Sequence, residues 1–371
     1  MTVEATETVV DTGRRHGTFH PLRVAAVDPL TDDAVAITFD VPADLSDAYA
    51  FDAGQHLTVR TGVDGEEIRR NYSICAPATE GRLRIGVKRL SGGAFSTLAT
   101  STLRVGDVVD VMTPTGRFTP RLERTQQRHY CAIAAGSGIT PVISIVATAL
   151  EVEPHSEVTL VYGNRTVASV MFLEELADLK DRYPGRFRLI HVLSREQQEA
   201  ELLSGRLDPD RLRRLLAALI PVDTVDQWYL CGPFAMVEGA MAVLAEAGVD
   251  AHTVHTELFH VEGETPRESV SPEEARAAGS STVLVTLDGR ATKVEVPRTG
   301  VRILDAVLGV RSDAPYACKG GVCGTCRAKL VSGQVEMARN FALDPEELAA
   351  GFVLACQSEP VTDGVELDFD A

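Results

Sequence analysis

A chain of 371 residues is long enough for two or three domains, and its hydrophobic fraction of 44% is sufficient to build their cores. Its net charge of −17 argues against nucleic acid or an anionic membrane surface as a partner. The first residues lack the apolar run of a signal peptide, and Cys75, Cys131 and Cys231 form no obvious pair, so we expect a protein of the reducing cytoplasm.

We expect residues 1–18 to form a flexible tail, and the following hundred residues to form strands. Between Val35 and Val41, every second residue is a large apolar one, which is the period of a strand with one buried face. Further strands are expected at 55–60, 69–74 and 83–88, with one short helix at 94–102. Many short strands of this kind predict a small β-barrel over residues 19–122.

Residues 123–260 have a different pattern, in which strands alternate with helices. Strands are predicted at 130–135, 158–162, 188–193 and 228–231, and a helix is predicted after each, starting at 140, 172, 209 and 234. The uncharged stretch at 131–150 is interrupted by glycines and a proline, so we interpret it as strand, turn and helix rather than a membrane span. This alternation predicts a parallel, doubly wound sheet.

Residues 261–280 are rich in Glu, Pro, Ser and Ala and carry little apolar periodicity, which is typical of a linker. The last domain, residues 281–371, is expected to begin with a hairpin over 282–296 that turns at Asp288-Gly289. Helices are expected at 303–308 and after Asp344, an N-cap residue that is followed by proline. The sequence therefore predicts three domains.

Four cysteines near the C-terminus form the most specific motif of the chain: Cys318, Cys323, Cys326 and Cys356, spaced C-x4-C-x2-C-x29-C. This is the plant-type spacing for a [2Fe–2S] cluster, with three thiolates on one tight loop and the fourth from a distant segment. Glycines at 320, 321 and 324 allow the loop to wrap closely and to aim N–H groups at sulfur. Structural zinc is the alternative, but zinc sites favour paired C-x2-C knuckles and only one such pair exists here.

Two short segments of the first domain indicate a flavin site. One is Arg70-Asn71-Tyr72-Ser73 at the end of a strand, and the other is Gly92-Gly93-Ala94-Phe95-Ser96 at the start of the predicted helix. Glycines before a helix present free N–H groups to a phosphate. We expect Arg70 to pair with a pyrophosphate, Tyr72 to lie on the flavin ring and Ser73 to sit near its N5 atom. Taken alone, the first segment is equally well a strand with an exposed arginine.

The second domain carries a candidate dinucleotide turn. Its residues follow a strand and open a helix: Gly136, Ser137, Gly138, Ile139, Thr140 and Pro141. Close backbone approach and a helix N-terminus suit a pyrophosphate, although Pro141 departs from the full glycine fingerprint and a plain turn is the alternative.

The ends of the next strands indicate which nucleotide is bound. Arg165, Ser194 and Arg195 suit a 2′-phosphate, whereas NAD sites usually place an acid there, so we expect the nucleotide to be NADPH. The alternative is that these residues only form a solvated loop. Cys231-Gly232-Pro233 ends the last of the predicted strands, and its cysteine is either a small buried residue or a contact for the nicotinamide.

The end of the second domain and the end of the chain complete the candidates. Glu257 is expected to shape the nicotinamide pocket with Cys231, and Phe259 to cover the flavin; Ser73, Cys231 and Glu257 are the candidate catalytic residues. Residues 343–371 contain eight acids and no Lys or Arg, which indicates either a solvated face or a docking surface for a basic partner.

Taken in order, R-x-Y-S, G-G-A-F-S, A-A-G-S-G-I-T-P, Y-G-N-R and C-G-P resemble the ferredoxin–NADP reductase superfamily. With a C-terminal plant-type ferredoxin domain, the chain resembles the reductase components of multicomponent oxygenases. Residues 19–371 are similar in particular to the reductase subunits of phenylacetyl-CoA 1,2-epoxidase complexes, on segments such as E-E-I-R-R-N-Y-S-I-C and P-Y-A-C-K-G-G-V-C-G-T-C.

The resemblance implies an FAD-binding β-barrel, an NADP-binding α/β domain and a β-grasp ferredoxin domain. It implies that electrons pass from NADPH through FAD and the [2Fe–2S] cluster to a diiron oxygenase that epoxidises the ring of phenylacetyl-CoA. Other interpretations stay open: a reductase for an aromatic-ring dioxygenase or a steroid hydroxylase, a non-catalytic electron-transfer subunit or redox sensor, and a structural subunit with vestigial sites.

Overall fold

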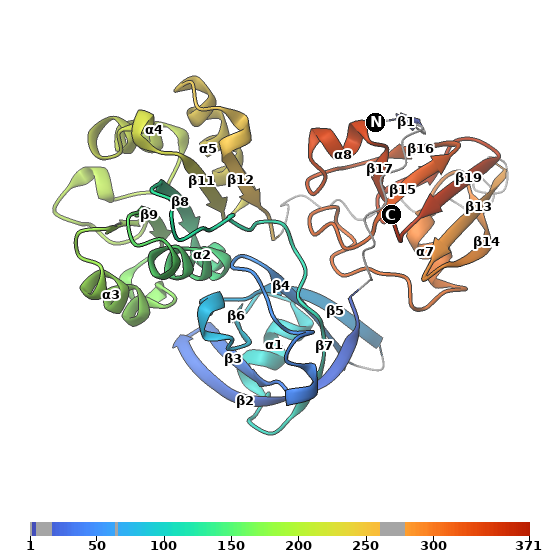
Figure 1. Cartoon of the computed structure of the whole chain (residues 1–371), viewed down its shortest axis with the longest axis horizontal. Helices are drawn as coiled ribbons and strands as arrows, with labels where there is room; N and C mark the ends of the chain where they lie inside the picture. The colour runs from blue at the N-terminus through green and yellow to red at the C-terminus, as the bar shows by residue number, and fades with distance from the viewer. Residues whose placement is uncertain (1, 5–16, 64–65, 260–278) are drawn as a thin grey trace. The chain divides into compact units, whose positions relative to one another are not determined.

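The computed structural model describes residues 2–4, 17–63, 66–259 and 279–371. It divides into two compact units, Phe19–Phe259 and a second that joins Met1–Thr18 to His260–Ala371 (Figure 1). The predicted linker at 261–280 lies outside the described residues except for its last two positions, and Ser280 already belongs to a strand. Among the described residues, no helix is long and apolar enough to cross a membrane.

The first part of the larger unit is an antiparallel barrel of six strands in the order β5-β4-β7-β2-β3-β6. Their bounds are β2 Phe19–Thr31, β3 Ala34–Asp40, β4 His56–Val63, β5 Glu66–Ser73, β6 Arg84–Lys88 and β7 Val108–Met112. A bridge between Ile74 and Ile85 closes the barrel, and helix α1 (Ala94–Ser101) buries Phe95 and Ala99 in its core. The barrel predicted from alternation is confirmed.

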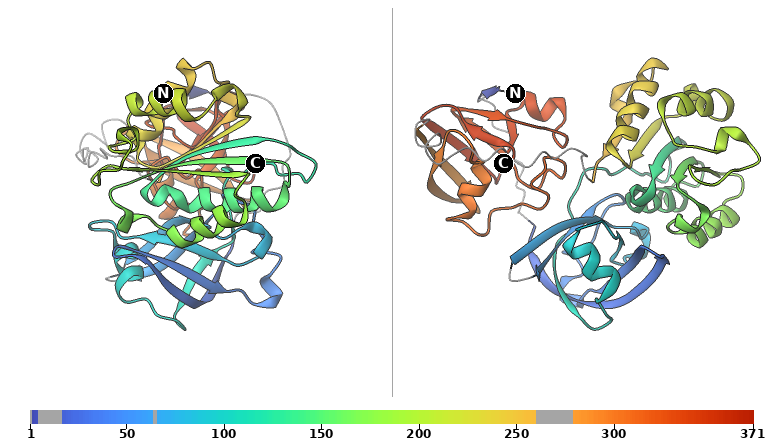
Figure 2. Two further views of the ribbon diagram at one scale, coloured as in Figure 1. Left: turned by 90° about the vertical axis from the view of Figure 1, so that its left-hand side faces the viewer. Right: turned by 180° about the vertical axis from the view of Figure 1, so that it is seen from behind.

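The second part is a five-stranded parallel sheet in the order β10-β9-β8-β11-β12. Its strands are β8 His129–Ala135, β9 Glu157–Asn164, β10 Phe187–Leu193, β11 Gln227–Cys231 and β12 Val254–Glu257. Its helices are α2 Ile139–Val152, α3 Leu173–Arg182, α4 Pro209–Leu219 and α5 Phe234–Glu246. Helices α2 and α3 pack on one face and α4 and α5 on the other (Figure 2), as a doubly wound fold requires.

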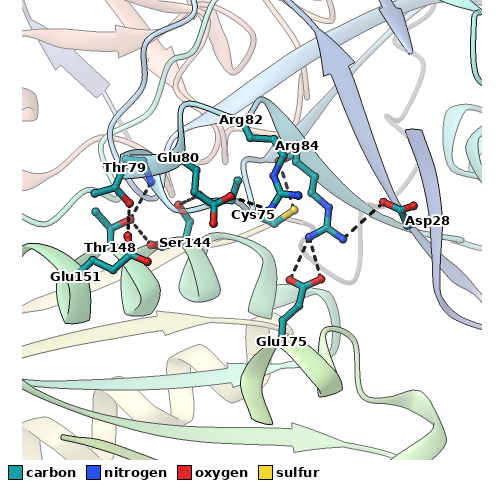
Figure 3. Close-up of polar contacts among 12 residues, drawn as sticks. Asp28, Cys75, Thr79, Glu80, Arg82, Arg84, Ser144, Thr148, Glu151 and Glu175 are labelled. Atoms are coloured by element: carbon teal, nitrogen blue, oxygen red, sulfur yellow. Dashed lines mark hydrogen bonds and ion pairs between the residues drawn. The ribbon is translucent and has the colours of Figure 1, made fainter. Parts of the chain in front are cut away.

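The barrel and the parallel sheet share one hydrophobic core, in which Ala36 and Phe118 of the barrel part join Val142 of α2. Polar contacts reinforce this joint (Figure 3): the Ser144 hydroxyl donates to the Ala76 carbonyl at 2.7 Å, and Arg84 donates to both carboxylate oxygens of Glu175 at 2.9 and 3.1 Å. The two domains of this unit are therefore held in one arrangement, on which a site between them depends.

The smaller unit is a mixed sheet in the order β14-β13-β19-β15-β17, covered by α7 (Ile303–Leu308). Its strands are β13 Ser280–Leu287, β14 Arg290–Pro297, β15 Arg327–Ser332, β17 Phe352–Leu354 and β19 Gly364–Asp368. The predicted hairpin turn is present, with positive φ at both Asp288 and Gly289. Helix α8 (Pro345–Ala349) starts at the predicted N-cap, Asp344, which accepts from the Glu347 N–H at 2.8 Å.

A second, three-stranded sheet in this unit corrects one expectation. Its strands are β1 (Thr2–Glu4), β16 (Gln334–Met337) and β18 (Ser358–Pro360). The prediction of a flexible tail over residues 1–18 is wrong for Thr2–Glu4, because these residues pair antiparallel with β16 and place Val3 opposite Val335. Residues 1 and 5–16 lie outside the described part of the chain.

Several acids of the C-terminal run are engaged within their own domain. Glu347 pairs with Arg327 at 2.7 Å and Glu359 pairs with Arg302 at 2.9 Å, while Asp370 accepts from two backbone N–H groups. These contacts hold the C-terminal segment in place, so the run of acids is in part structural rather than a surface of free negative charge.

Candidate functional site

The three candidate catalytic residues come together where the barrel meets the parallel sheet. Ser73 ends β5 and Glu257 ends β12, and the Ser73 hydroxyl donates to Glu257 Oε2 at 3.0 Å. Cys231 is the register partner of Glu257 in the β11–β12 pairing. A barrel strand and two sheet strands thus converge on one small group, with Ser73 only 2% exposed.

Cys231 is a neutral thiol in this setting. Complete burial, together with the nearby charge of Glu257, raises its pKa well above the ordinary value of a thiol. Because the thiolate is the reactive form of cysteine, Cys231 is unsuited to act as a nucleophile. It can form an uncharged wall of a pocket, which is the role that contact with a nicotinamide would need.

His56 is a member of this site that sequence reasoning missed. It lies opposite Ser73 in the β4–β5 pairing, and its side chain is buried. Its Nδ1 atom is 3.8 Å from Glu257 Oε1, and its Nε2 atom is 3.1 Å from the Asn71 side-chain amide. The signal that could have found it is Asp64-Gly65, the two residues between β4 and β5, because Asp-Gly predicts a two-residue hairpin turn and pairing the strands across it brings His56 beside Ser73.

The predicted flavin-binding segments are adjacent to this group. Arg70 is exposed and Tyr72 is half-buried, and alternation along β5 turns both away from the face of Ser73. The Tyr72 ring lies 5.3 Å from that of Phe95, which connects the strand to the glycine turn before α1.

The glycine turn is tight. Gly92 has a positive φ, and a Cβ on Gly93 would lie 2.4 Å from the Ser96 hydroxyl oxygen. That hydroxyl accepts from the Leu90 N–H and donates to the Gly93 carbonyl, both at 3.1 Å, and α1 then begins at Ala94. An arginine, a half-buried ring and a glycine-led helix start are residues that fit a flavin with its pyrophosphate.

The candidate dinucleotide turn lies at the switch point of the parallel sheet, between β8 and β11. Gly136 has a φ of 55°, and its carbonyl accepts from the Tyr162 hydroxyl at 2.9 Å. Ser137 accepts from the Thr140 hydroxyl at 3.0 Å, and Pro141 occupies the first turn of α2, where no backbone N–H is needed.

Gly138 brings two turns of this sheet together. A Cβ there would lie 2.1 Å from the Cys231 carbonyl oxygen and 2.8 Å from the Gly232 nitrogen. The turn after β8 and the Cys231-Gly232-Pro233 turn after β11 are therefore in backbone contact. The two together make the crevice in which doubly wound sheets bind nucleotides.

The candidate 2′-phosphate residues lie at neighbouring strand ends. The Arg195 N–H donates to the Arg165 carbonyl at 2.8 Å, and the Ser194 N–H donates to the Asn164 carbonyl at 2.9 Å. The Arg165 guanidinium contacts Asp33 at 3.1 Å, and Lys88 lies 3.6 Å from the same carboxylate. Burial alone would raise the pKa of Asp33, but the Thr31 hydroxyl, Lys88 and Arg165 outweigh it, and the net effect is a lowered pKa.

The four cysteines of the smaller unit form two contacting pairs, Cys318 with Cys323 and Cys326 with Cys356. The contact with Cys323 lowers the pKa of Cys318 to about 6, and the contact with Cys326 lowers that of Cys356. Over the described residues, no three His, Cys, Asp or Glu side chains are placed to hold one metal ion. Two pairs of thiols suit two irons better than a single tetrahedral zinc.

The surroundings of these cysteines also fit a cluster. The Gly320 N–H donates to Cys318 Sγ at 3.3 Å, and the Thr325 hydroxyl is buried beside Cys323 with no oxygen or nitrogen partner among the described residues. Gln357, a second residue that sequence reasoning missed, donates to the Lys319 carbonyl at 2.8 Å and to Cys356 Sγ at 3.5 Å. It directly follows the fourth cysteine, and that adjacency is the only signal that could have found it.

Comparisons with known families agree with this division. Residues 21–119 match the oxidoreductase FAD-binding domain, residues 132–242 the oxidoreductase NAD-binding domain, and residues 285–361 the 2Fe-2S iron-sulfur cluster binding domain. The protein is therefore an oxidoreductase built to hold FAD, a nicotinamide nucleotide and a [2Fe–2S] cluster.

Relatives narrow this class further. The chain is 46% identical to a subunit of the 1,2-phenylacetyl-CoA epoxidase of Escherichia coli K12, over 95% of this chain and 98% of that protein. It is 35% identical to the ferredoxin reductase component of 3-ketosteroid-9-alpha-monooxygenase from Rhodococcus rhodochrous, over 94% and 96%. The chain belongs to the family of reductase components of multicomponent oxygenases, within the ferredoxin–NADP reductase superfamily.

Solved structures show the same fold. Phthalate dioxygenase reductase superposes with a TM-score of 0.60 at 24% identity, over 95% of this chain and 98% of that one. An intact type IV self-sufficient cytochrome P450 monooxygenase matches with a TM-score of 0.67 at 24% identity, over 98% of this chain but 43% of that one. The expected order of barrel, parallel sheet and ferredoxin domain is confirmed.

Proposed function

We propose that this chain is the reductase subunit of a phenylacetyl-CoA ring-epoxidising monooxygenase, and that it passes electrons from NADPH to diiron oxygenase subunits. The observation that carries the reductase role is the convergence of Ser73, Glu257 and Cys231 at the joint of the FAD-binding barrel and the NAD-binding sheet. The choice of partner is supported by the 46% identity to the Escherichia coli epoxidase subunit over nearly the full length of both chains.

FAD, when bound, takes two electrons as hydride from the nicotinamide and releases them one at a time to the iron–sulfur cluster. The protein supplies position and electrostatics. With the cofactors bound, the Ser73 hydroxyl, which Glu257 holds, would face the flavin N5 edge, and the neutral Cys231 thiol would form a wall of the nicotinamide pocket. Phe259, which is 39% exposed, is the candidate cover for the flavin ring.

The preference for NADPH is argued from charge. Two arginines on adjacent strand ends, with a serine beside them and no acid among the three, suit a 2′-phosphate. Arg195 is exposed, while Arg165 contacts Asp33 and must exchange that carboxylate for the phosphate. Because Arg165 has to leave Asp33 before it binds the phosphate, the preference for NADPH over NADH is weakened but not removed.

A cytoplasmic location is part of the proposal. All seven cysteines are free thiols in the structure, and Cys75, Cys131 and Cys231 are buried. Four thiols that must remain reduced to hold a cluster suit a reducing compartment.

The test is anaerobic reduction by NADPH, followed by turnover with purified phenylacetyl-CoA oxygenase subunits and their thioester substrate. If flavin and cluster bleach and epoxide forms only when this chain is added, the proposal stands. If both bleach and no epoxide forms, the partner assignment is wrong, and a steroid monooxygenase becomes the next candidate because its reductase component is 35% identical. If NADPH bleaches neither group, the reductase role itself is refuted.

A further inference from the structure

His56 lies next to both Ser73 and Glu257, and we propose that it is the positioning residue that orients Glu257 for flavin reduction. It pairs with Ser73 across β4 and β5, and the pair two positions further along, Thr58 with Asn71, lies on the same face of the barrel. The inference rests on the function proposed above, because it assigns His56 a task in the same site. Neither the motifs of the chain nor its matches to families single this residue out.

Both oxygens of the Glu257 carboxylate have a defined neighbour. Oε2 accepts the Ser73 hydroxyl at 3.0 Å, and Oε1 faces His56 Nδ1 at 3.8 Å. The second distance is longer than a direct hydrogen bond, so the interaction is electrostatic. The Glu257 side chain is 15% exposed and that of His56 7%, so water screens the interaction little.

These contacts select one tautomer of the imidazole. A lone pair on Nδ1 would face the carboxylate and be repelled, so the ring proton belongs on Nδ1. Nε2 must then accept, and two donors are available: the Asn71 amide nitrogen at 3.1 Å and the Thr115 hydroxyl at 3.3 Å. The Thr58 hydroxyl donates to Asn71 Oδ1 at 2.8 Å, which turns the amide nitrogen of Asn71 towards His56.

The ring is also fixed in place. His56 is paired by backbone hydrogen bonds to Thr115, and a Cβ on the next residue, Gly116, would lie 2.9 Å from His56 Nδ1. Gly116 has a φ of 124°, a conformation that suits glycine, so its backbone can close over the ring. The imidazole is therefore held on one side by a hydrogen-bonded amide and on the other by a glycine, with its N–H aimed at Glu257.

This arrangement explains how His56 can affect the orientation of the Ser73 hydroxyl without touching the flavin itself. Glu257 comes from the parallel sheet, whereas Ser73, Asn71 and His56 come from the barrel. Held by Ser73 and His56 together, the carboxylate keeps one orientation, and with it the Ser73 hydroxyl keeps its own. Loss of the Nδ1–H group would release Oε1 and let the carboxylate turn, which displaces the hydroxyl that is meant to meet flavin N5.

Two substitutions separate this role from simple packing. In His56→Asn the side-chain amide can replace the Nδ1–H group, whereas His56→Gln places its amide near the position of Nε2 and leaves Oε1 of Glu257 without an N–H group facing it. We expect His56→Gln to slow flavin reduction at saturating NADPH by roughly tenfold, because a misplacement of about 1 Å can cost up to about 10²-fold in rate. The rate for His56→Asn should stay within about threefold of that of the unaltered protein. The dissociation constant for NADPH should change by less than about twofold in both.

The control is His20→Gln, which removes an imidazole contact with the Tyr49 hydroxyl (3.2 Å) elsewhere in the same barrel. A second readout needs no turnover. In nitrogen-15 NMR spectra of the flavin-loaded protein, the imidazole signal that disappears in both His56 variants belongs to His56. Its chemical shifts should be those of the Nδ1–H tautomer. An Nε2–H tautomer, or equal rates for the two variants, would overturn the inference. Absence of flavin reduction in the unaltered protein would instead refute the proposed function, which keeps the two failures distinct.

Discussion

Gly138→Ala tests whether the nucleotide crevice depends on backbone contact between two turns. Gly138 has a φ of −60° and a ψ of −10°, which alanine adopts without strain, so any effect must come from the added methyl group. That methyl carbon would lie 2.1 Å from the Cys231 carbonyl oxygen, whereas real Cβ contacts are essentially never shorter than 3.0 Å. The two turns must therefore separate by at least 0.9 Å, and neither is a flexible side chain that could rotate away.

The magnitude follows from that displacement. Overpacking of this kind costs about 1–3 kcal/mol of stability. Because a misplacement of about 1 Å costs up to about 10²-fold in rate, we expect hydride transfer from NADPH to fall by roughly ten- to a hundredfold. Binding of NADPH should weaken as well, since the displaced turn is the one expected to carry the pyrophosphate.

The assay is stopped-flow reduction of the flavin over a range of NADPH concentrations, with thermal unfolding as a check on the fold. Gly248→Ala is the matched control: Gly248 follows α5 with a φ of 79°, and no atom of the described residues lies within 4 Å of an added methyl group there. That variant should lose roughly 1–2 kcal/mol of stability from its backbone conformation and keep the kinetics of the original chain. A Gly138→Ala protein that binds and oxidises NADPH normally would refute the close-approach argument.

Three further outcomes are expected. Gln357→Leu removes the donor to Cys356 Sγ and to the Lys319 carbonyl, so it should lower the reduction potential of the cluster in an EPR-monitored titration. The control Ser358→Ala loses only a buried contact to the Leu354 carbonyl at 2.9 Å and should leave the potential unchanged. Equal potentials for the two variants would exclude the sulfur contact as the cause. Asp33→Asn should strengthen the binding of NADPH by up to about fivefold and leave the binding of NADH unchanged, because the exposed ion pair that competes for Arg165 contributes about 0.2–1 kcal/mol. Unchanged NADPH affinity in a binding titration would show that Arg165 does not contact the phosphate. Cys231 should resist iodoacetamide at pH 8 in the folded protein, because burial raises its thiol pKa, and mass-spectrometric detection of its alkylation would contradict that burial.

Short-range signals in the sequence were sufficient for much of this molecule. The glycine turns at 92–93 and 136–138 and the capped helix after Asp344 each depend on residues a few positions apart, and each is found in the structure as expected. The cysteine motif combines three closely spaced residues with a distant fourth, and its domain matches the 2Fe-2S iron-sulfur cluster binding family. The alternation of strands and helices in the second domain is of the same kind. Strands β2 and β7 of the barrel were missed, and in β2 register shifts at Val24/Ala26 and Pro29/Thr31 interrupt the alternation on which a strand prediction depends.

The tertiary structure decided how these segments meet. Ser73 and Glu257 come from different domains, and their contact depends on the core that the barrel and the parallel sheet share. The same holds for the approach of His56 to Glu257, which joins the barrel to the parallel sheet, and for Thr2–Glu4, whose partner is at the other end of the chain. Spacing along a chain encodes turns and periods because the backbone fixes local geometry, whereas contacts between distant strands are set by which hydrophobic faces pack together.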